Sequence, residues 1–298
     1  MKEYKDIRDD QIRIIGDKNE KLSFFRKKYI ALCILGIIIG IIIIIVICTS
    51  QKNLEEEEPG YFEPTVILPA DPIRYKPLGR DVDSIVQGFV EIRDTSINDI
   101  PFKIYIPHNA EMSLHIGKIN KEDTTIVYVA QAADVRADNG NIVGAFVLKG
   151  EPRAWGLSKK GFCASINGKI TVGVAENSPL FEKATEEGGY FFRQYPLVSN
   201  GKIVENEPKG KSIRRGICDR KGEIFMVETL TPESFHDFAQ ALVDLGVGQA
   251  IYLVGSSAYG WAVDEYKVKH EFGIENQFTY YRRRMPKNTS YIVWKRSN

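Results

Sequence analysis

The chain has 298 residues, of which 43% are hydrophobic, and its formal net charge is +1. A chain of this size can bury one substantial core, and its near-neutral charge gives no electrostatic reason to expect nucleic acid as a partner. The sequence contains no H-E-x-x-H, P-loop or G-x-S-x-G motif, so no motif in it requires a metal or another cofactor.

The first 50 residues predict a membrane anchor. A charged segment, 1–28, ends in Arg26-Lys27-Lys28 and precedes 22 uncharged, isoleucine-rich residues, 29–50. A helix of that length rises about 33 Å, enough to cross the hydrocarbon core of a bilayer. Basic residues before the span and acidic residues after it place the N-terminus in the cytoplasm. We therefore expect a cytoplasmic tail (1–28), a transmembrane helix (29–50) and an extracytoplasmic remainder, which would be periplasmic in a Gram-negative cell.

Two other interpretations of the span 29–50 are a buried core helix and a cleaved signal peptide. The span has no polar face, its charged head is long for a signal peptide, and no small-x-small cleavage site follows it. Gly36 and Gly40 form a G-x-x-x-G pattern that permits two such helices to dimerise. An isoleucine-rich segment also produces this spacing by chance.

Residues 51–80 have the composition of a linker, and 81–298 predict one strand-rich domain. The linker contains four consecutive acids and five prolines. Asn139-Gly140, Asn167-Gly168 and Asn200-Gly201 are strong signals for hairpin turns. Alternating apolar residues predict strands at Ile85–Ile92, Phe102–Ile106, Thr125–Ala130, Ile142–Leu148, Phe162–Ile166, Ile170–Val174, Phe191–Val198 and Tyr291–Trp294.

The segment 223–254 predicts a strand, a helix and a second strand. The strands are the apolar runs Ile224–Val227 and Ala250–Val254, and the helix is 232–245, with Thr231 as its N-cap and Gly246 as its stop. A unit of this length is most simply a parallel pair joined by a right-handed crossover. With one more predicted helix at Pro179–Glu187, the expected fold class is α+β, a strand-rich mixed sheet preceded by one transmembrane helix.

Cys163 and Cys218 lie in the part expected outside the cytoplasm, where a disulfide is chemically permitted. Each cysteine also stands in an apolar strand, where a free thiol packs well. The sequence leaves both alternatives open.

The order of several motifs resembles the phosphodiester glycosidase family, and the match covers about residues 131–260. Each motif is weak alone, whereas their order and spacing are fairly specific. The resemblance implies a hydrolase of glycosyl phosphodiesters or related envelope glycans. The motifs are Gly168–Val174, Pro179–Ala184, Gln194-Tyr195-Pro196-Leu197-Val198, Asn200-Gly201, Arg214-Arg215-Gly216-Ile217, Phe235–Ala239 and Ala250–Gly255.

A phosphodiester carries a negative charge, so its binding site requires fixed cations. Arg193, Arg214 and Arg215 lie in or beside apolar strands, and Arg214 matches the arginine of the family motif. A salt bridge at a strand edge explains any one of them equally well. Gln194 stands at the family's glutamine and is a candidate for hydrogen bonds to sugar hydroxyls. Arg136 belongs to a polar cluster with Asp138 and Asn139, which a capped turn also explains.

The loop after the second strand, Gly255–Gly260, is the expected ligand-binding edge of the sheet. Candidates there are Gly255, Ser256, Ser257, Tyr259 and Trp261, whose aromatic rings suit stacking on a sugar or, equally, packing on the sheet. The family's aspartate in this loop is replaced by Val254, which can neither transfer a proton nor bind a cation. Asp134 and Glu176 are therefore the candidate catalytic carboxylates.

Two functions remain open from the sequence. One is hydrolysis of a glycosyl phosphodiester by a rearranged carboxylate pair, which requires two carboxyl groups within about 5 to 10 Å of each other. The other is a non-catalytic glycan- or peptide-binding module that keeps the fold but lacks the family aspartate. The expected partners are a carbohydrate or glycosyl phosphodiester and, through residues 29–50, a membrane.

Overall fold

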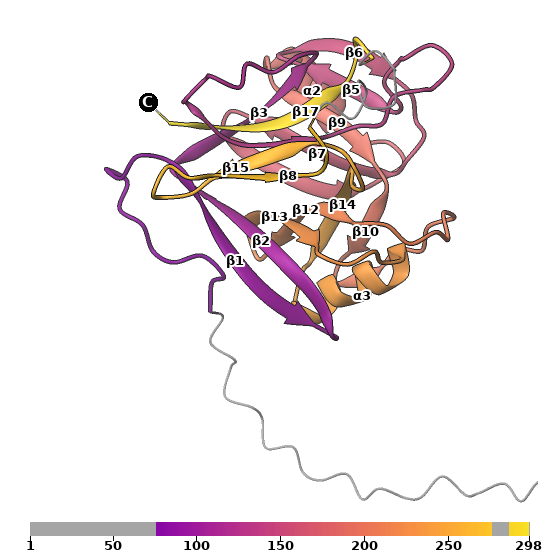
Figure 1. The fold of residues 1–298 in the computed structure, drawn as a ribbon. Coiled ribbons are helices and arrows are strands. Elements are labelled where there is room, and N and C mark those ends of the chain that lie inside the picture. Colours follow the sequence, from indigo (N-terminus) through magenta and orange to yellow (C-terminus); the bar gives the residue numbers. More distant parts are fainter. Residues whose placement is uncertain (1–75, 276–285, 298) are drawn as a thin grey trace, which may run out of the picture. The chain divides into compact units, whose positions relative to one another are not determined.

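Residues 76–275 and 286–297 are the part of the chain that the structure, a computed structural model, describes (Figure 1). No helix within these ranges is long and apolar enough to cross a membrane. The part of the chain that the structure describes therefore has no transmembrane helix, against the transmembrane helix and single-pass topology expected from the sequence. The segment predicted to span the bilayer, 29–50 with Gly36 and Gly40, lies outside the described residues, as do 1–28 and most of the predicted linker.

The described strands form three antiparallel sheets, of which sheet A is the largest with seven strands. Asn200-Gly201 joins two of its strands with φ angles of 51° and 71°, so this predicted hairpin turn is confirmed. The strands of sheet A, in spatial order, are β1 (Phe89–Ile97), β2 (Ile100–His108), β13 (Glu223–Thr229), β12 (Arg215–Arg220), β14 (Gln249–Leu253), β10 (Pro196–Ser199) and β11 (Lys202–Ile203).

The predicted parallel pair within 223–254 is wrong. β13 and β14 both occur, but β12 lies between them and is antiparallel to each. The buried side chains Ile217 and Cys218 of β12 lie where the sequence pattern predicted a direct contact between β13 and β14. The predicted mixed sheet and the class α+β are therefore replaced by antiparallel sheets with two short helices in the described part.

The helix between β13 and β14 is α3 (Phe235–Asp244), and it begins three residues later than predicted. Ser234 is its N-cap, because the Ser234 hydroxyl accepts the Asp237 N–H at 3.0 Å. Gly246, with φ +85°, ends the helix as predicted. Phe238 and Leu242 are fully buried in a cluster with strands of sheet A, and α3 lies beside β10 (Figure 1).

Sheets B and C have five strands each. The helix α2 (Leu180–Glu186) packs on sheet C, and the turn Asn167-Gly168 forms the predicted hairpin between β7 and β8. Sheet B has the order β16 (Lys269–Phe272), β15 (Gly260–Val263), β4 (Ile126–Gln131), β17 (Ser290–Arg296) and β3 (Ala110–Ile116). Sheet C has the order β6 (Glu151–Trp155), β5 (Ala145–Leu148), β9 (Tyr190–Gln194), β7 (Gly161–Ile166) and β8 (Lys169–Val174).

One apolar core is shared by all three sheets. It contains Leu253 from sheet A, Val129 from sheet B and Phe192 and Cys163 from sheet C, all fully buried. Cys163 and Cys218 are both free thiols, which settles the disulfide question in favour of separate packing. Because the sheets meet around one core, the ends of strands from different sheets come together at its border.

Candidate functional site

The ends of β4, β9 and β14 meet at one point, and each belongs to a different sheet. The Val254 N–H donates to the Gln131 carbonyl at 3.0 Å, and the Tyr252 N–H donates to the Tyr195 carbonyl at 2.9 Å. The residues that follow these strands are therefore held side by side. This junction contains several of the candidates drawn from the sequence.

A buried lysine that the sequence did not single out lies at the centre of the junction. The Lys159 ammonium forms an ion pair with Asp134, donates to the Gln194 side-chain carbonyl at 2.8 Å and lies 4.3 Å from the centre of the Tyr195 ring. The Gln194 amide in turn donates to the Asp134 carboxylate at 3.3 Å. We call these four residues, Asp134, Lys159, Gln194 and Tyr195, the Lys159 cluster.

The electrostatics of the cluster are unusual for a lysine. The Lys159 side chain is only 8% exposed, and burial lowers its pKa, while the Asp134 carboxylate acts in the opposite direction. An ammonium has three N–H donors, and the residues that the structure describes accept two of them. The Asp134 side chain is 36% exposed, so its carboxylate is reachable from solvent. The backbone of Lys159 is in the left-handed region with φ +68°. This conformation is unfavourable for a residue other than glycine, so the turn carries backbone strain.

Arg193, a predicted substrate-binding residue, instead supports the turn that carries Lys159. Its guanidinium is buried and donates to the carbonyls of Lys159 and Ala175 at 3.1 Å each, and of Glu176 at 2.7 Å. The burial lowers the pKa of Arg193. With these carbonyl partners, the guanidinium joins the loop before β7 to the loop after β8.

Arg214 lies at the other end of a run of aromatic rings. Its guanidinium carbon is 4.0 Å from the centre of the Phe235 ring, and its Nε donates to the Glu233 carbonyl at 2.8 Å. Phe235 contacts Tyr195 and Tyr252, with ring centres 5.5 and 5.0 Å apart. The cations of Lys159 and Arg214 are therefore connected through an aromatic wall.

The loop predicted to bind ligand is held rigidly by Arg215. This buried side chain donates to the carbonyls of Val254 at 3.2 Å, Ser256 at 3.5 Å and Ala258 at 2.7 Å. A Cβ at Gly255 would lie 2.2 Å from the Ile213 carbonyl oxygen, so only glycine fits there. The Gly255 N–H also donates to the Tyr252 hydroxyl at 3.0 Å, which connects the start of the loop to the aromatic wall.

The other loop candidates do not present a stacking surface. Trp261 is buried, and the Tyr259 hydroxyl donates to Glu271 at 2.6 Å. Burial raises the pKa of Tyr259, and Glu271 adds to this shift. Ser256 is exposed with φ +55°, and the Ser257 carbonyl accepts the N–H of Ile274 at 3.0 Å.

Glu176 and Arg136 lie on the surface with local partners. Glu176 pairs with Lys160 at 2.6 Å, and this hydrogen bond lowers the pKa of the carboxyl group. Arg136 pairs with Asp138 at 2.8 Å. Of the two predicted catalytic carboxylates, Asp134 belongs to the Lys159 cluster and Glu176 is bound by a different lysine. Within the described ranges, no group of three or more His, Cys, Asp and Glu side chains is arranged to hold a metal ion.

No protein-family model matches the chain, and no curated protein matches it. Among solved structures, the catalytic domain of zebrafish N-acetylglucosamine-1-phosphodiester alpha-N-acetylglucosaminidase, auto-inhibited by its pro-peptide, is similar. It is 13% identical, with a TM-score of 0.47 over 71% of this chain and 83% of that one. A hypothetical protein from Synechocystis is 12% identical, with a TM-score of 0.45 over 70% of this chain and 62% of that one. These are similarities of fold at low identity, and they assign no activity.

Proposed function

We propose that the Lys159 cluster and Arg214 bind an anionic glycan of the glycosyl phosphodiester class. The observation that carries the proposal is the buried Lys159 ammonium, which lies against one half-exposed carboxylate and keeps a third donor for a further acceptor. A buried charge is costly unless it is paired, and such groups concentrate at functional sites.

The chemistry of the surrounding residues fits the two parts of such a ligand. Lys159 supplies the cation that a phosphodiester requires, and Arg214, which is buried and donates to the carbonyls of Glu233 and Gly210, adds positive charge behind the aromatic wall. Asp134 supplies a half-exposed carboxylate for sugar hydroxyls, and the fully buried Gln194 amide holds Asp134 and Lys159 in place. The partly exposed Tyr195 ring supplies an apolar surface of the kind found in small-ligand sites, and the buried rings of Phe235 and Tyr252 pack behind it.

Binding is better supported than hydrolysis. Glycoside hydrolysis by two carboxylates requires both groups at the scissile bond. The Lys159 cluster contains one carboxylate, Asp134, and Val254 stands in the loop where the resembled family has its aspartate. Asp134 is then the one carboxylate of the cluster that could take part if turnover occurs.

The test is calorimetric titration of the full-length chain with three probes, namely the methyl phosphodiester of N-acetylglucosamine, free N-acetylglucosamine and dimethyl phosphate. We expect the diester to bind more tightly than either fragment. Lys159→Met should weaken diester binding about 10- to 100-fold, the value of a charge-assisted hydrogen bond. The matched control is Lys160→Met, which removes the exposed neighbouring ammonium and should change affinity less than about twofold.

Equal losses from the two lysine variants would contradict the proposal, as would a wild-type protein that binds none of the three probes. Thermal unfolding of each variant distinguishes lost binding from lost folding. Asp134 is half-exposed, so water can solvate its carboxylate after Lys159 is removed, and we expect the Lys159→Met variant to fold.

A further inference from the structure

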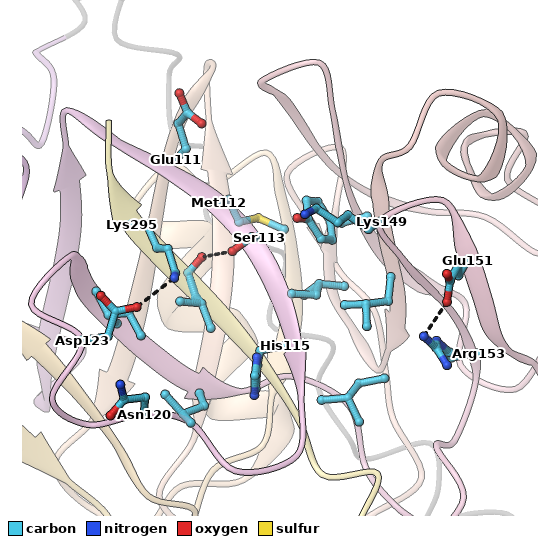
Figure 2. Close-up of a pocket in the computed structure, with 17 residues that line it drawn as sticks. Glu111, Met112, Ser113, His115, Asn120, Asp123, Lys149, Glu151, Arg153 and Lys295 are labelled. Carbon is cyan, nitrogen blue, oxygen red and sulfur yellow. Dashed lines mark hydrogen bonds and ion pairs between the residues drawn. The ribbon is translucent and has the colours of Figure 1, made fainter. Parts of the chain in front are cut away.

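A cavity of about 690 Å³ lies along strand β3, and no residue of the Lys159 cluster lines it (Figure 2). One wall comes from β3 and β17 of sheet B, and the other from the β5–β6 hairpin of sheet C. Figure 2 shows Lys295 and Asp123 on one side of β3, and Glu151 and Arg153 on the other. We call this cavity the β3 groove.

The β3 groove follows the edge of a sheet. β3 is the last strand of sheet B, so one side of its backbone has no neighbour among the strands that the structure describes. All residues from 111 to 116 line the groove, although alternate side chains of a strand point to opposite faces. Side chains from both faces can line one groove only if it runs past the strand's edge. The Met112 carbonyl of β3 accepts the Ser165 hydroxyl of β7 at 3.4 Å, and the other N–H and C=O groups on the open side of β3 border the groove.

The two sides of β3 differ in polarity. Met112 and Leu114 are buried, and Leu148 on the hairpin lines the same groove, which gives an apolar side. Ser113 and His115 alternate with them and give a polar side. A strand laid beside β3 would therefore present apolar residues at every second position.

Two of the charged side chains that line the groove take no part in the ion pairs formed within it. Lys295 pairs with Asp123 at 2.9 Å, and Arg153 pairs with Glu151. Lys149 and Glu111 are exposed, and neither has an ion-pair partner within the described ranges. Lys149 lies at the turn of the β5–β6 hairpin with φ +54°, and its exposed side chain can reach the groove that it lines.

We infer that the β3 groove binds an extended peptide segment of another protein, which adds to β3 as a further antiparallel or parallel strand. Main-chain hydrogen bonds to β3 provide affinity, and alternate side chains provide specificity. The apolar residues of the segment pack against Leu114 and Leu148, and an acidic residue pairs with Lys149. A glycan has no regularly spaced N–H and C=O groups to match a strand edge, so a peptide suits the groove better.

Selection of random heptapeptides displayed on phage, with the full-length chain as target, tests the inference. Seven residues match the length of β3. We expect enriched sequences that alternate apolar and polar residues and contain Asp or Glu. Fluorescence polarisation with the best labelled peptide should show at least about tenfold weaker binding to Lys149→Glu, and less than twofold change for Lys202→Glu, an exposed lysine of β11 in sheet A.

Backbone N-methylation of the peptide gives a second, independent readout. A strand bonds its neighbour through every second residue, so methylation of one alternate set should abolish binding and methylation of the other should leave it unchanged. Equal effects of the two sets, indifference to Lys149→Glu, or a selection that enriches nothing would each overturn the inference. Sedimentation that shows a dimer, displaced by no peptide, would assign the edge to a second copy of the chain and would overturn it as well.

Discussion

Arg215 and Glu228 face each other across β12 and β13 as a buried ion pair, with 2.7 Å between Nη2 and Oε1. Their side chains are 1% and 8% exposed. The second carboxylate oxygen accepts the Tyr105 hydroxyl at 3.0 Å, and the guanidinium reaches the carbonyls of the 254–258 loop. This pair therefore connects the middle of sheet A to the loop beside the candidate site.

Glu228→Ala should lower the free energy of unfolding by about 3–5 kcal/mol, because it leaves the Arg215 charge buried without its partner. Glu151→Ala removes an exposed carboxylate that pairs with Arg153, and it should cost less than about 1 kcal/mol. Urea denaturation of both variants measures the difference. Similar costs would show that the interior pair does not carry the stability that its burial implies.

Phe238→Ala in α3 should cost about 3–5 kcal/mol, because the ring is fully buried against sheet A and its loss leaves a cavity. Gln240 is half-buried and donates to Asp244 within the helix at 2.9 Å. Gln240→Ala should cost less than about 0.5 kcal/mol. The comparison uses thermal and urea unfolding, and a large effect of Gln240→Ala would mean that the packed face of α3 is assigned incorrectly.

The contribution of Asp123 to the free energy of unfolding should be lost in acid. Hydrogen bonds, from the Thr125 hydroxyl first and then from Lys295, lower the pKa of Asp123 from 3.8 to about 2. Because the folded-state pKa is below the unfolded one, the contribution of Asp123 is complete above about pH 4 and is lost as the pH falls towards 2. The stability difference between wild type and Asp123→Asn should therefore shrink over that interval. Thr125→Val, which removes the first donor, should reduce the pH-dependent part, and a difference that stays constant from pH 5 to pH 2 would refute the assignment.

Turnover of the methyl phosphodiester of N-acetylglucosamine by the wild-type protein should be weak or absent. General acid–base assistance is worth about 10²–10⁴-fold, and Val254 supplies none. Val254→Asp should raise the rate of sugar release, measured by NMR, above that of Val254→Asn, which has a similar size and no acid. Robust wild-type turnover that survives both Asp134→Asn and Glu176→Gln would place the catalytic groups elsewhere.

Local signals in the sequence predicted several elements well. The Asn-Gly pairs at 167–168 and 200–201 take the left-handed conformations that tight hairpins require, and both hairpins form. Phe238 and Leu242 face the sheet because their helical spacing puts them on one side of α3. These features depend on residues close in the chain, which is why a pattern can predict them.

Strand order could not be predicted in the same way. β12 lies between β13 and β14, and the alternation of apolar residues does not predict this position. Any apolar strand of suitable length can occupy the centre of a sheet. The parallel pair was the simplest arrangement for neighbouring elements, and the intervening strand excluded it. β15 and β16 were not predicted either, because each has only four residues. β3 was also missed, although its apolar and polar residues alternate as in other strands.

The candidate site was predicted in part. Asp134 and Gln194 lie in one cluster, and Arg214 is connected to it through Phe235 and Tyr195. Lys159 was not predicted as a site residue, because the sequence Ser158-Lys159-Lys160 is typical of a solvated turn. Its burial depends on Asp134 and on Gln194, which are 25 and 35 positions away in the chain. The spacing of these groups carries no periodic signal, so only the fold brings them together.

The position of β17 has a consequence for how the chain folds. β17 is an interior strand of sheet B, between β4 and the edge strand β3, and its Val293 contacts Ser113 across 180 positions of sequence. Pairing over such a distance costs loop-closure entropy before any contacts between the strands can form. Sheet B should therefore close late. Pulsed hydrogen exchange during refolding should find the amides of the β7–β8 hairpin protected before those of β4, and simultaneous protection would contradict this order. Until β17 arrives, β3 and β4 both present open edges, and it is in this interval that the nascent molecule is most vulnerable to aggregation.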